Sequence, residues 1–310
     1  MNRLHALAAV GAVAVVVAIA LYPSQSAGDS QTSSGTRETT APATVEASPA
    51  FNEQRLNSEP VASSSASPET RQALETLLRQ LNDARSYRQF IAAALKDAPR
   101  GGFIYAAEAS QQCDKFQSAR DSTKPQATSN QALQSAALLE ARCDITSDEF
   151  FERLSAALSA EKATLNSDPL FAMLVPNSSG KSREDSLRQA RALLDSGDPI
   201  AMESLVHLDF RDPIGETPYF DGHHYRSPAD RDLMDDAWLL VECSLGLVCD
   251  AEATQTLLLC ATRDWCGSDV AEALQIGRGP DGTFVQVQTL ANSLLSAIRS
   301  KRAAAFVPAS

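Results

Sequence analysis

The number and spacing of the cysteines constrain this chain more than any other feature. There are six of them, an even number, and all follow an apolar N-terminal segment. That combination is typical of proteins that fold outside the reducing cytoplasm and carry disulfides. Two pairs have the same Cys-x5-Cys spacing. The cysteines are Cys113, Cys143, Cys243, Cys249, Cys260 and Cys266.

The repeated spacing predicts two local disulfides. Cys243 ends a predicted helix, and Gly246 can adopt the left-handed conformation that turns the chain back toward Cys249. Such a reversal brings two Cα atoms to the separation of about 4.4–6.8 Å that disulfides require. The second Cys-x5-Cys unit repeats this pattern, and the two remaining cysteines are left for each other, although crossed pairings stay open. The expected pairs are Cys243–Cys249, Cys260–Cys266 and Cys113–Cys143.

A metal or redox role for the cysteines has less support. Structural zinc sites use cysteines that are closer together than the Cys-x5-Cys units allow. The Cys-x-x-Cys motif of disulfide oxidoreductases is absent from the sequence. We therefore expect structural disulfides, and neither a metal nor a cofactor.

The N-terminal segment predicts export. Arg3 and the amino terminus supply positive charge before an uncharged run from Ala6 to Leu21. A helix of this length spans about 24 Å, less than the roughly 30 Å hydrocarbon core of a bilayer. Residues 1–22 therefore fit either a signal peptide or a short signal anchor. Both alternatives place the rest of the chain on the periplasmic side of the inner membrane, anchored there or secreted into the periplasm.

Composition divides the remaining chain into a tether and a folded domain. Residues 23–67 are rich in Ser, Thr, Ala and Pro and have few large apolar side chains, so they predict a disordered tether. Residues 68–305 are long enough for a sizeable core, with a candidate sub-boundary near 176–182. The net charge of −12 argues against nucleic acid as a partner. We expect contact with the membrane through the N-terminal segment only.

Apolar periodicity predicts an all-α domain. Leu74, Leu77 and Leu81 recur at helical spacing, and no window alternates convincingly as a strand would. Short connections between the predicted helices favour antiparallel helix pairs, in a solenoid-like arrangement or an irregular bundle, stapled by the disulfides. A short helix is expected over 103–113, and residues 209–227 are expected to be irregular. Further helices are expected to begin at or just after Pro68, Thr128, Thr146, Ser182, Pro199, Ser227, Asp250, Ser268 and Thr283.

Three segments resemble known helical proteins. The stretch from Leu194 to Ala201 places glycine and proline as in the turns of tetratricopeptide or Sel1-type repeats, and the doubled helix-then-Cys-x5-Cys unit over 237–266 is similar to such helix pairs. The segment from Arg85 to Cys113, with Gly101-Gly102-Phe103, resembles a class of exported, uncharacterised proteobacterial all-helical proteins. The resemblance implies repeat-like helices and carries no activity with it.

One loop, residues 212–226, is the strongest candidate for a binding site. It holds two of the four histidines, three aromatic residues and several carboxylates. Adjacent histidines point in different directions in most backbones, so this pair would chelate a metal poorly. The alternative is a solvent-facing loop whose aromatic rings pack on neighbouring helices. The candidate binding residues are Glu216, Tyr219, Asp221, His223, His224, Tyr225 and Arg226.

Catalytic signals are weaker than binding signals. Two carboxylates in 212–236 could act on cell-wall glycan or peptide, as in a periplasmic hydrolase. Carboxylates at a helix start, such as Asp230 and Asp232, also simply complement the helix dipole. No Gly-x-Ser-x-Gly motif is present. The sequence does not determine the function; it favours a non-enzymatic cell-envelope protein that binds a protein or peptide of the envelope.

Overall fold

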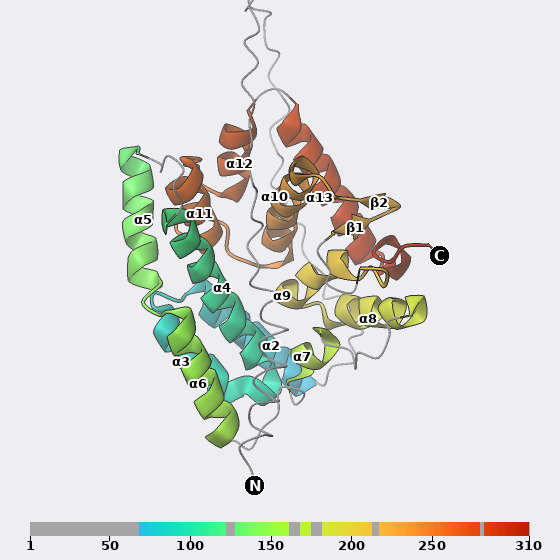
Figure 1. Cartoon of the computed structure of the whole chain (residues 1–310), viewed down its shortest axis with the longest axis horizontal. Coiled ribbons are helices and arrows are strands. Elements are labelled where there is room, and N and C mark those ends of the chain that lie inside the picture. Colours follow the sequence, from blue (N-terminus) through green and yellow to red (C-terminus); the bar gives the residue numbers. More distant parts are fainter. Residues whose placement is uncertain are drawn as a thin grey trace, which may run out of the picture. The chain divides into compact units, whose positions relative to one another are not determined.

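The computed structural model describes residues 68–121, 128–160, 168–174, 182–212, 217–279 and 282–309. In these ranges the chain is almost entirely helical, which confirms the all-α prediction (Figure 1). None of the described helices is long and apolar enough to cross a membrane. The predicted signal segment 1–22, the predicted tether 23–67 and most of the candidate sub-boundary 176–182 lie outside the described residues.

The first helices are set by their caps and by close packing at a double glycine. Ser86 accepts a hydrogen bond from the backbone N–H of Gln89 and so begins α3. Gly101 has a φ of 103°, and a Cβ on Gly102 would lie 1.9 Å from the carbonyl oxygen of Ala94. The segments are α2 (Pro68–Asn82), α3 (Tyr87–Ala94), the 3-10 helix η1 (Leu95–Arg100), α4 (Gly102–Asp121), α5 (Asn130–Arg142) and α6 (Ser147–Ala160). The helix expected over 103–113 is longer than predicted. It is α4, which continues to Asp121, so Cys113 lies in its interior.

The second half contains one feature that the sequence analysis did not anticipate, a short antiparallel hairpin within the segment 209–227. The elements are α7 (Pro169–Leu174), α8 (Arg183–Ser196), α9 (Pro199–Met202), η3 (Glu203–His207), β1 (Tyr219–Phe220), β2 (His223–His224), α10 (Pro228–Leu245), α11 (Thr254–Arg263), α12 (Val270–Arg278), α13 (Thr283–Arg299) and η4 (Ala303–Ala305).

Helix starts follow the local capping rules where the capping residue has an acidic partner. Helices begin at Ser182 and Ser227, as expected, and both residues form complete capping boxes. Asp250 does not cap α11: its carboxylate accepts the backbone N–H of Glu252, and the helix begins only after Ala253. Three other N-caps differ by one residue from expectation, namely Ser129, Asp269 and Gly282.

All three predicted disulfides are present. The Cα–Cα distances are 5.3 Å for Cys113–Cys143, 5.7 Å for Cys243–Cys249 and 4.3 Å for Cys260–Cys266. Gly246 and Asp264, with φ values of 114° and 61°, make the left-handed turns that reverse the chain inside the two local pairs. The Cys243–Cys249 and Cys260–Cys266 pairings thus follow from the local chain reversals. No cysteine is left free.

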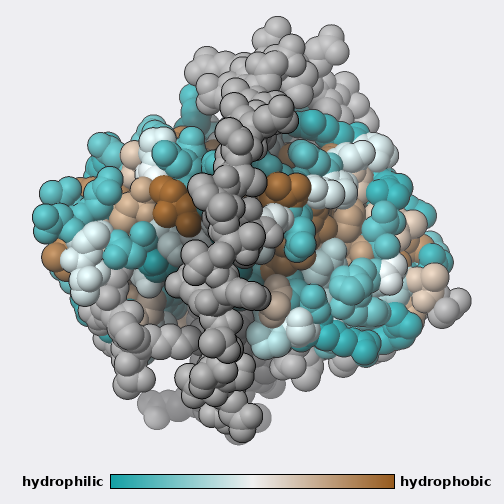
Figure 2. All heavy atoms as spheres, turned by 90° about the horizontal axis from the view of Figure 1, so that it is seen from above, coloured by the Kyte–Doolittle hydropathy of each residue, from teal (hydrophilic) through white to brown (hydrophobic). Residues whose placement is uncertain are grey.

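One hydrophobic cluster runs through the described helices, from α2 to the segment after η4. Its largest fully buried side chains include Tyr87, Tyr105, Phe150 and Phe306. Helix α5 packs mainly on α11, where Leu139 and Leu257 belong to a small separate cluster. In the view of Figure 2, hydrophilic residues cover most of the described surface and hydrophobic ones form separate groups.

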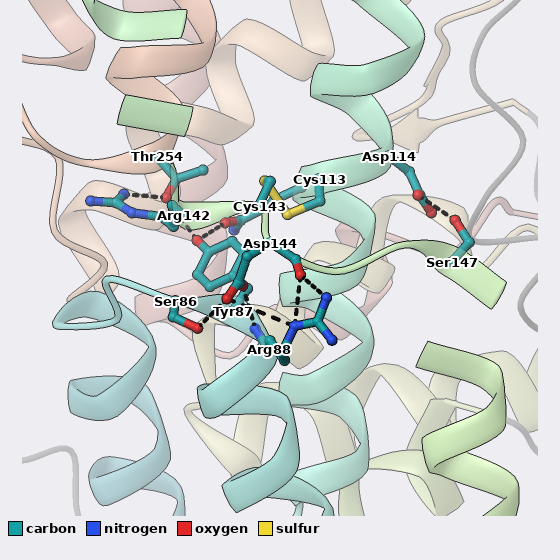
Figure 3. Close-up of a disulfide and its surroundings, with 11 residues drawn as sticks. Ser86, Tyr87, Arg88, Cys113, Asp114, Arg142, Cys143, Asp144, Ser147 and Thr254 are labelled. Carbon is teal, nitrogen blue, oxygen red and sulfur yellow. Dashed lines mark hydrogen bonds and ion pairs between the residues drawn. A yellow bond between two sulfur atoms is a disulfide. The ribbon is translucent and has the colours of Figure 1, made fainter. Parts of the chain in front are cut away.

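A buried polar network ties α3 and α5 to the start of α11. The Tyr87 hydroxyl lies 2.7 Å from that of Thr254, and it donates to the side chain of Gln112 (Figure 3). Arg142 also donates to Thr254, at 2.6 Å. Burial raises the pKa of Tyr87 to about 12, so the hydroxyl keeps its proton and serves as a neutral link. These contacts hold residues far apart in the sequence together beside the Cys113–Cys143 disulfide.

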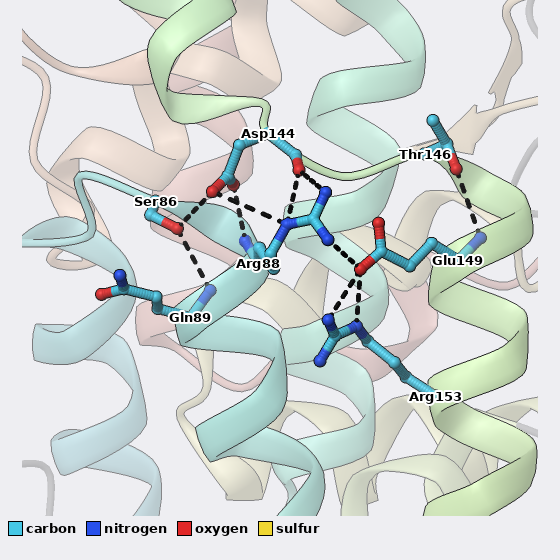
Figure 4. A network of polar contacts seen from close by, with 7 residues as sticks. All are labelled: Ser86, Arg88, Gln89, Asp144, Thr146, Glu149 and Arg153. Atoms are coloured by element: carbon cyan, nitrogen blue, oxygen red, sulfur yellow. Dashed lines mark hydrogen bonds and ion pairs between the residues drawn. The ribbon is translucent and has the colours of Figure 1, made fainter.

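A second network fixes α6 against α3. Asp144 accepts the backbone N–H of Arg88 at 2.9 Å, and the Asp144 carbonyl accepts the Arg88 Nε–H at 2.8 Å (Figure 4). Glu149 pairs with both Arg88 and Arg153. The guanidinium of Arg88 therefore bridges the α5–α6 connection and the first turn of α6.

Candidate functional site

The hairpin is held firmly although each of its strands has only two residues. Tyr219 pairs with His224, and Phe220 with His223. Phe220 is buried, and its ring centroid lies 5.3 Å from that of Phe306. The backbone N–H of Asp221 donates to the carbonyl of Ala305 at 2.7 Å. The hairpin is therefore anchored on η4, and Figure 1 shows it beside that end of the chain.

A polar hollow lies next to the hairpin, with a volume of about 470 Å³. Its walls come from the segment after η3, from Thr217, from His224 on β2 and from Arg226, two residues beyond that strand. The lining residues are Asp209, Arg211, Asp212, Thr217, His224 and Arg226. The volume falls in the usual range of small-ligand sites.

Asp209, Arg211 and His224 form one connected group in this hollow. The Asp209 carboxylate is almost fully buried and accepts the backbone N–H of Arg211 at 2.9 Å. Its other oxygen lies 3.5 Å from His224 Nδ1. Arg211 Nη2 lies 3.1 Å from His224 Nε2. A guanidinium can only donate, so a hydrogen bond between these two groups uses the lone pair of Nε2.

The aromatic ring of Tyr219 supports His224 from one side. The two ring centroids are 4.9 Å apart, and the Tyr219 hydroxyl accepts the backbone N–H of Gly222 at 3.1 Å. Asp212 also has a fixed position, because its carboxylate accepts the backbone N–H of Thr217 at 2.8 Å. Contacts within the protein thus order the part of the wall formed by Asp209, Arg211, Asp212 and His224.

Of the residues expected in the binding loop, His224 and Arg226 line the hollow. The others build or flank the hairpin: Asp221 is exposed and lies 3.4 Å from Arg302 Nη1, and the ring of exposed His223 meets that of Tyr225 edge-on. Glu216 lies outside the described residues.

Sequence reasoning missed Asp209 and Arg211, which precede the loop, and Thr217, which lies within it. One local signal for the hairpin was present. Asp221-Gly222 between aromatic residues favours a two-residue hairpin turn, and both residues have positive φ.

The carboxylates expected to serve a hydrolase mostly have structural partners. Asp230 belongs to the α10 capping box, and the hydrogen bond from Ser227 lowers its pKa. Asp236 is buried and pairs with Arg278 and Arg263. Among the described residues, no group of three or more His, Cys, Asp or Glu side chains is arranged to hold a metal ion.

Another group of charges comes from α4, η3 and α10. Glu242 is 7% exposed, and burial, together with nearby Glu203 and Glu108, raises its pKa well above the usual value. Burial raises the pKa of Asp235 to about 6. The nearby charge of Glu203 also raises it, whereas that of Lys115 lowers it. The carboxylates of this group outnumber its single lysine, and their mutual repulsion contributes to the raised pKa values of Glu242 and Asp235.

Comparison with protein-family models, curated proteins and solved structures found no match to this chain. The geometry of the hollow and of the hairpin is therefore the basis for a functional proposal.

Proposed function

We propose that this chain is an exported, disulfide-stapled helical protein that binds a protein or peptide of the cell envelope through the hairpin and its hollow. The observation that carries the proposal is the polar hollow, in which Asp209, Arg211 and His224 are held in place by contacts within the protein before any ligand arrives. Rigid presentation reduces the entropy lost on binding, so a preformed site binds more tightly than a flexible one with the same contacts.

The surroundings of the hollow support binding. His223 and Arg226 are exposed beside the ordered groups, so an approaching chain would meet polar side chains that are still hydrated. Such rims with directional donors are typical of specific, non-obligate interfaces. Arginine, exposed here at Arg211 and Arg226, is enriched among the residues that contribute most to such interfaces.

The proposed location outside the cytoplasm is supported by the three disulfides, because these bonds persist in oxidising compartments. They also restrict the unfolded chain, which helps a domain of modest core to stay folded.

A site-specific photocrosslinking experiment in the native host tests the proposal. Benzoylphenylalanine would replace exposed His223 in one variant and exposed Asn292, on α13, in the control variant. We expect a discrete crosslinked partner at position 223, identified by mass spectrometry and displaced by excess purified chain, and none at position 292. Identical adducts at both positions, or none at 223, would refute the proposed surface.

A further inference from the structure

The charges in the hollow narrow the class of ligand, on the premise that the proposed binding surface is correct. We infer that the hollow binds a carboxylate group of the partner, with the guanidinium groups of Arg211 and Arg226 as its main contacts.

The acidic residues of the hollow are already engaged within the protein. Asp209 accepts both the backbone N–H of Arg211, at 2.9 Å, and its Nε–H, at 3.4 Å. Asp212 accepts the backbone N–H of Thr217. Asp209 is buried and Asp212 half-buried, whereas Arg211 and Arg226 are exposed, so a ligand in the hollow meets the guanidinium groups more readily than the carboxylates.

The cationic residues retain donors for a ligand. Within the described residues, Arg226 makes no hydrogen bond or ion pair, and it is exposed. Arg211 is positioned by Asp209 and His224, and its guanidinium lies 5.6 Å from the ring centroid of Phe210. A planar guanidinium matches a carboxylate with two parallel hydrogen bonds, which gives both strength and orientation.

The balance of charge distinguishes a carboxylate from a phosphate. The lining contains two arginines and two aspartates, so the charges of these four side chains balance. A phosphate group, with a charge of about −1.5 to −2, would bring more negative charge next to Asp209 and Asp212 than the arginines balance. A singly charged carboxylate adds less repulsion. The volume of about 470 Å³ leaves room for the residue that carries it.

The test measures binding of small probes to the full oxidised chain by NMR titration. The probes are acetyl-Ala-Ala with a free C-terminus, the same dipeptide as its amide, acetyl-Glu-amide and inorganic phosphate. We expect at least one of the two carboxylate probes to bind at least about tenfold more tightly than the neutral amide, with shifts at His224 and at the Arg211 guanidinium. Whichever of the two binds more tightly identifies the source, a chain terminus or an acidic side chain.

Variants show whether the binding depends on the hollow. Arg226→Gln should weaken binding of the carboxylate at least about fivefold, whereas Arg299→Gln, an exposed arginine at the end of α13, should leave it unchanged. Unfolding midpoints establish that both variants fold. Equal binding of acid and amide, tighter binding of phosphate, or equal effects of the two variants would overturn the inference.

These outcomes separate the inference from the proposed function. A crosslink at position 223 with no carboxylate binding would refute the ligand class and leave the interaction surface standing. Absence of both would refute the surface as well.

Discussion

Asp168 joins two helices, and its replacement gives a sharp test of how the domain is held together. The residue is fully buried. One carboxylate oxygen accepts the backbone N–H of Phe103, at the start of α4, at 3.0 Å. The other accepts the N–H groups of Leu170 and Phe171, at the start of α7, at 2.8 and 3.0 Å. One side chain therefore satisfies donors at two helix N-termini.

The expected cost of Asp168→Ala follows from two opposing effects. Three buried N–H groups are left unsatisfied, and their own desolvation costs about 1.5–2 kcal/mol each, or about 5 kcal/mol together. In the opposite direction, burial raises the pKa of Asp168 to about 6, despite the hydrogen bonds from Phe171, Leu170 and Phe103. A shift of about two units means that keeping the carboxylate ionised at neutral pH costs about 3 kcal/mol. The net destabilisation is then about 2 kcal/mol.

Urea unfolding followed by circular dichroism at pH 7 measures this cost. Asp168→Asn keeps an acceptor oxygen and removes the charge, so it should cost less than Asp168→Ala. Because the folded-state pKa is raised, the folded protein binds a proton that the unfolded chain has lost between about pH 4 and 6. The stability of the wild type relative to Asp168→Asn should therefore fall as the pH rises through this window. A loss below about 0.5 kcal/mol for Asp168→Ala, or a difference that does not vary with pH, would refute the reasoning.

Three further measurements test other parts of the structure. Removing Cys113–Cys143 should cost about 3.5 kcal/mol, against about 2 kcal/mol for either local disulfide, because it closes a span of 30 residues rather than 6; equal losses in urea unfolding would contradict this ranking. Gly277→Ala would bring a Cβ to within 1.9 Å of the Trp265 ring. We expect it to lower the free energy of unfolding by about 1–3 kcal/mol and to alter the near-ultraviolet dichroism spectrum. An unchanged spectrum and unfolding midpoint would show that the ring has room. Glu242→Gln should raise the thermal midpoint at pH 7.5, because burial raises the pKa of Glu242 and its ionised form opposes folding at neutral pH. This gain should shrink on acidification. A gain that grows toward acid pH would reverse the sign we infer.

Features determined by neighbouring residues could be predicted from the sequence. The helix starts at Ser182 and Ser227 depend on local caps, each with an aspartate three residues later, so these starts were predicted correctly. The local disulfides depend on a reversal at Gly246 or Asp264 and were also predicted. The helix cap predicted at Asp250 was wrong, because an aspartate can hydrogen-bond in a turn as readily as at a helix start.

The hollow could be predicted only in part. His224 and Arg226 lie in the polar segment that the composition singled out, but Asp209 and Arg211 meet them only through tertiary structure. Their approach depends on the hairpin, which is anchored by a hydrogen bond to the distant Ala305. Strands of two residues are also too short to show an alternating pattern.

The contacts between α2–α3 and the start of α11 have a consequence for the order of folding. Asn82 bonds to the backbone of Val248, Arg85 to Glu252 and Tyr87 to Thr254, each pair more than 160 residues apart. Contacts between such distant residues form late, because closing a long loop costs entropy before any contact repays it. If the chain crosses a membrane starting from its N-terminus, α2 and α3 cannot complete their packing until residue 254 has emerged. The leading half would then stay open to the translocation machinery and to oxidants, and Cys113–Cys143 could form before the core closes.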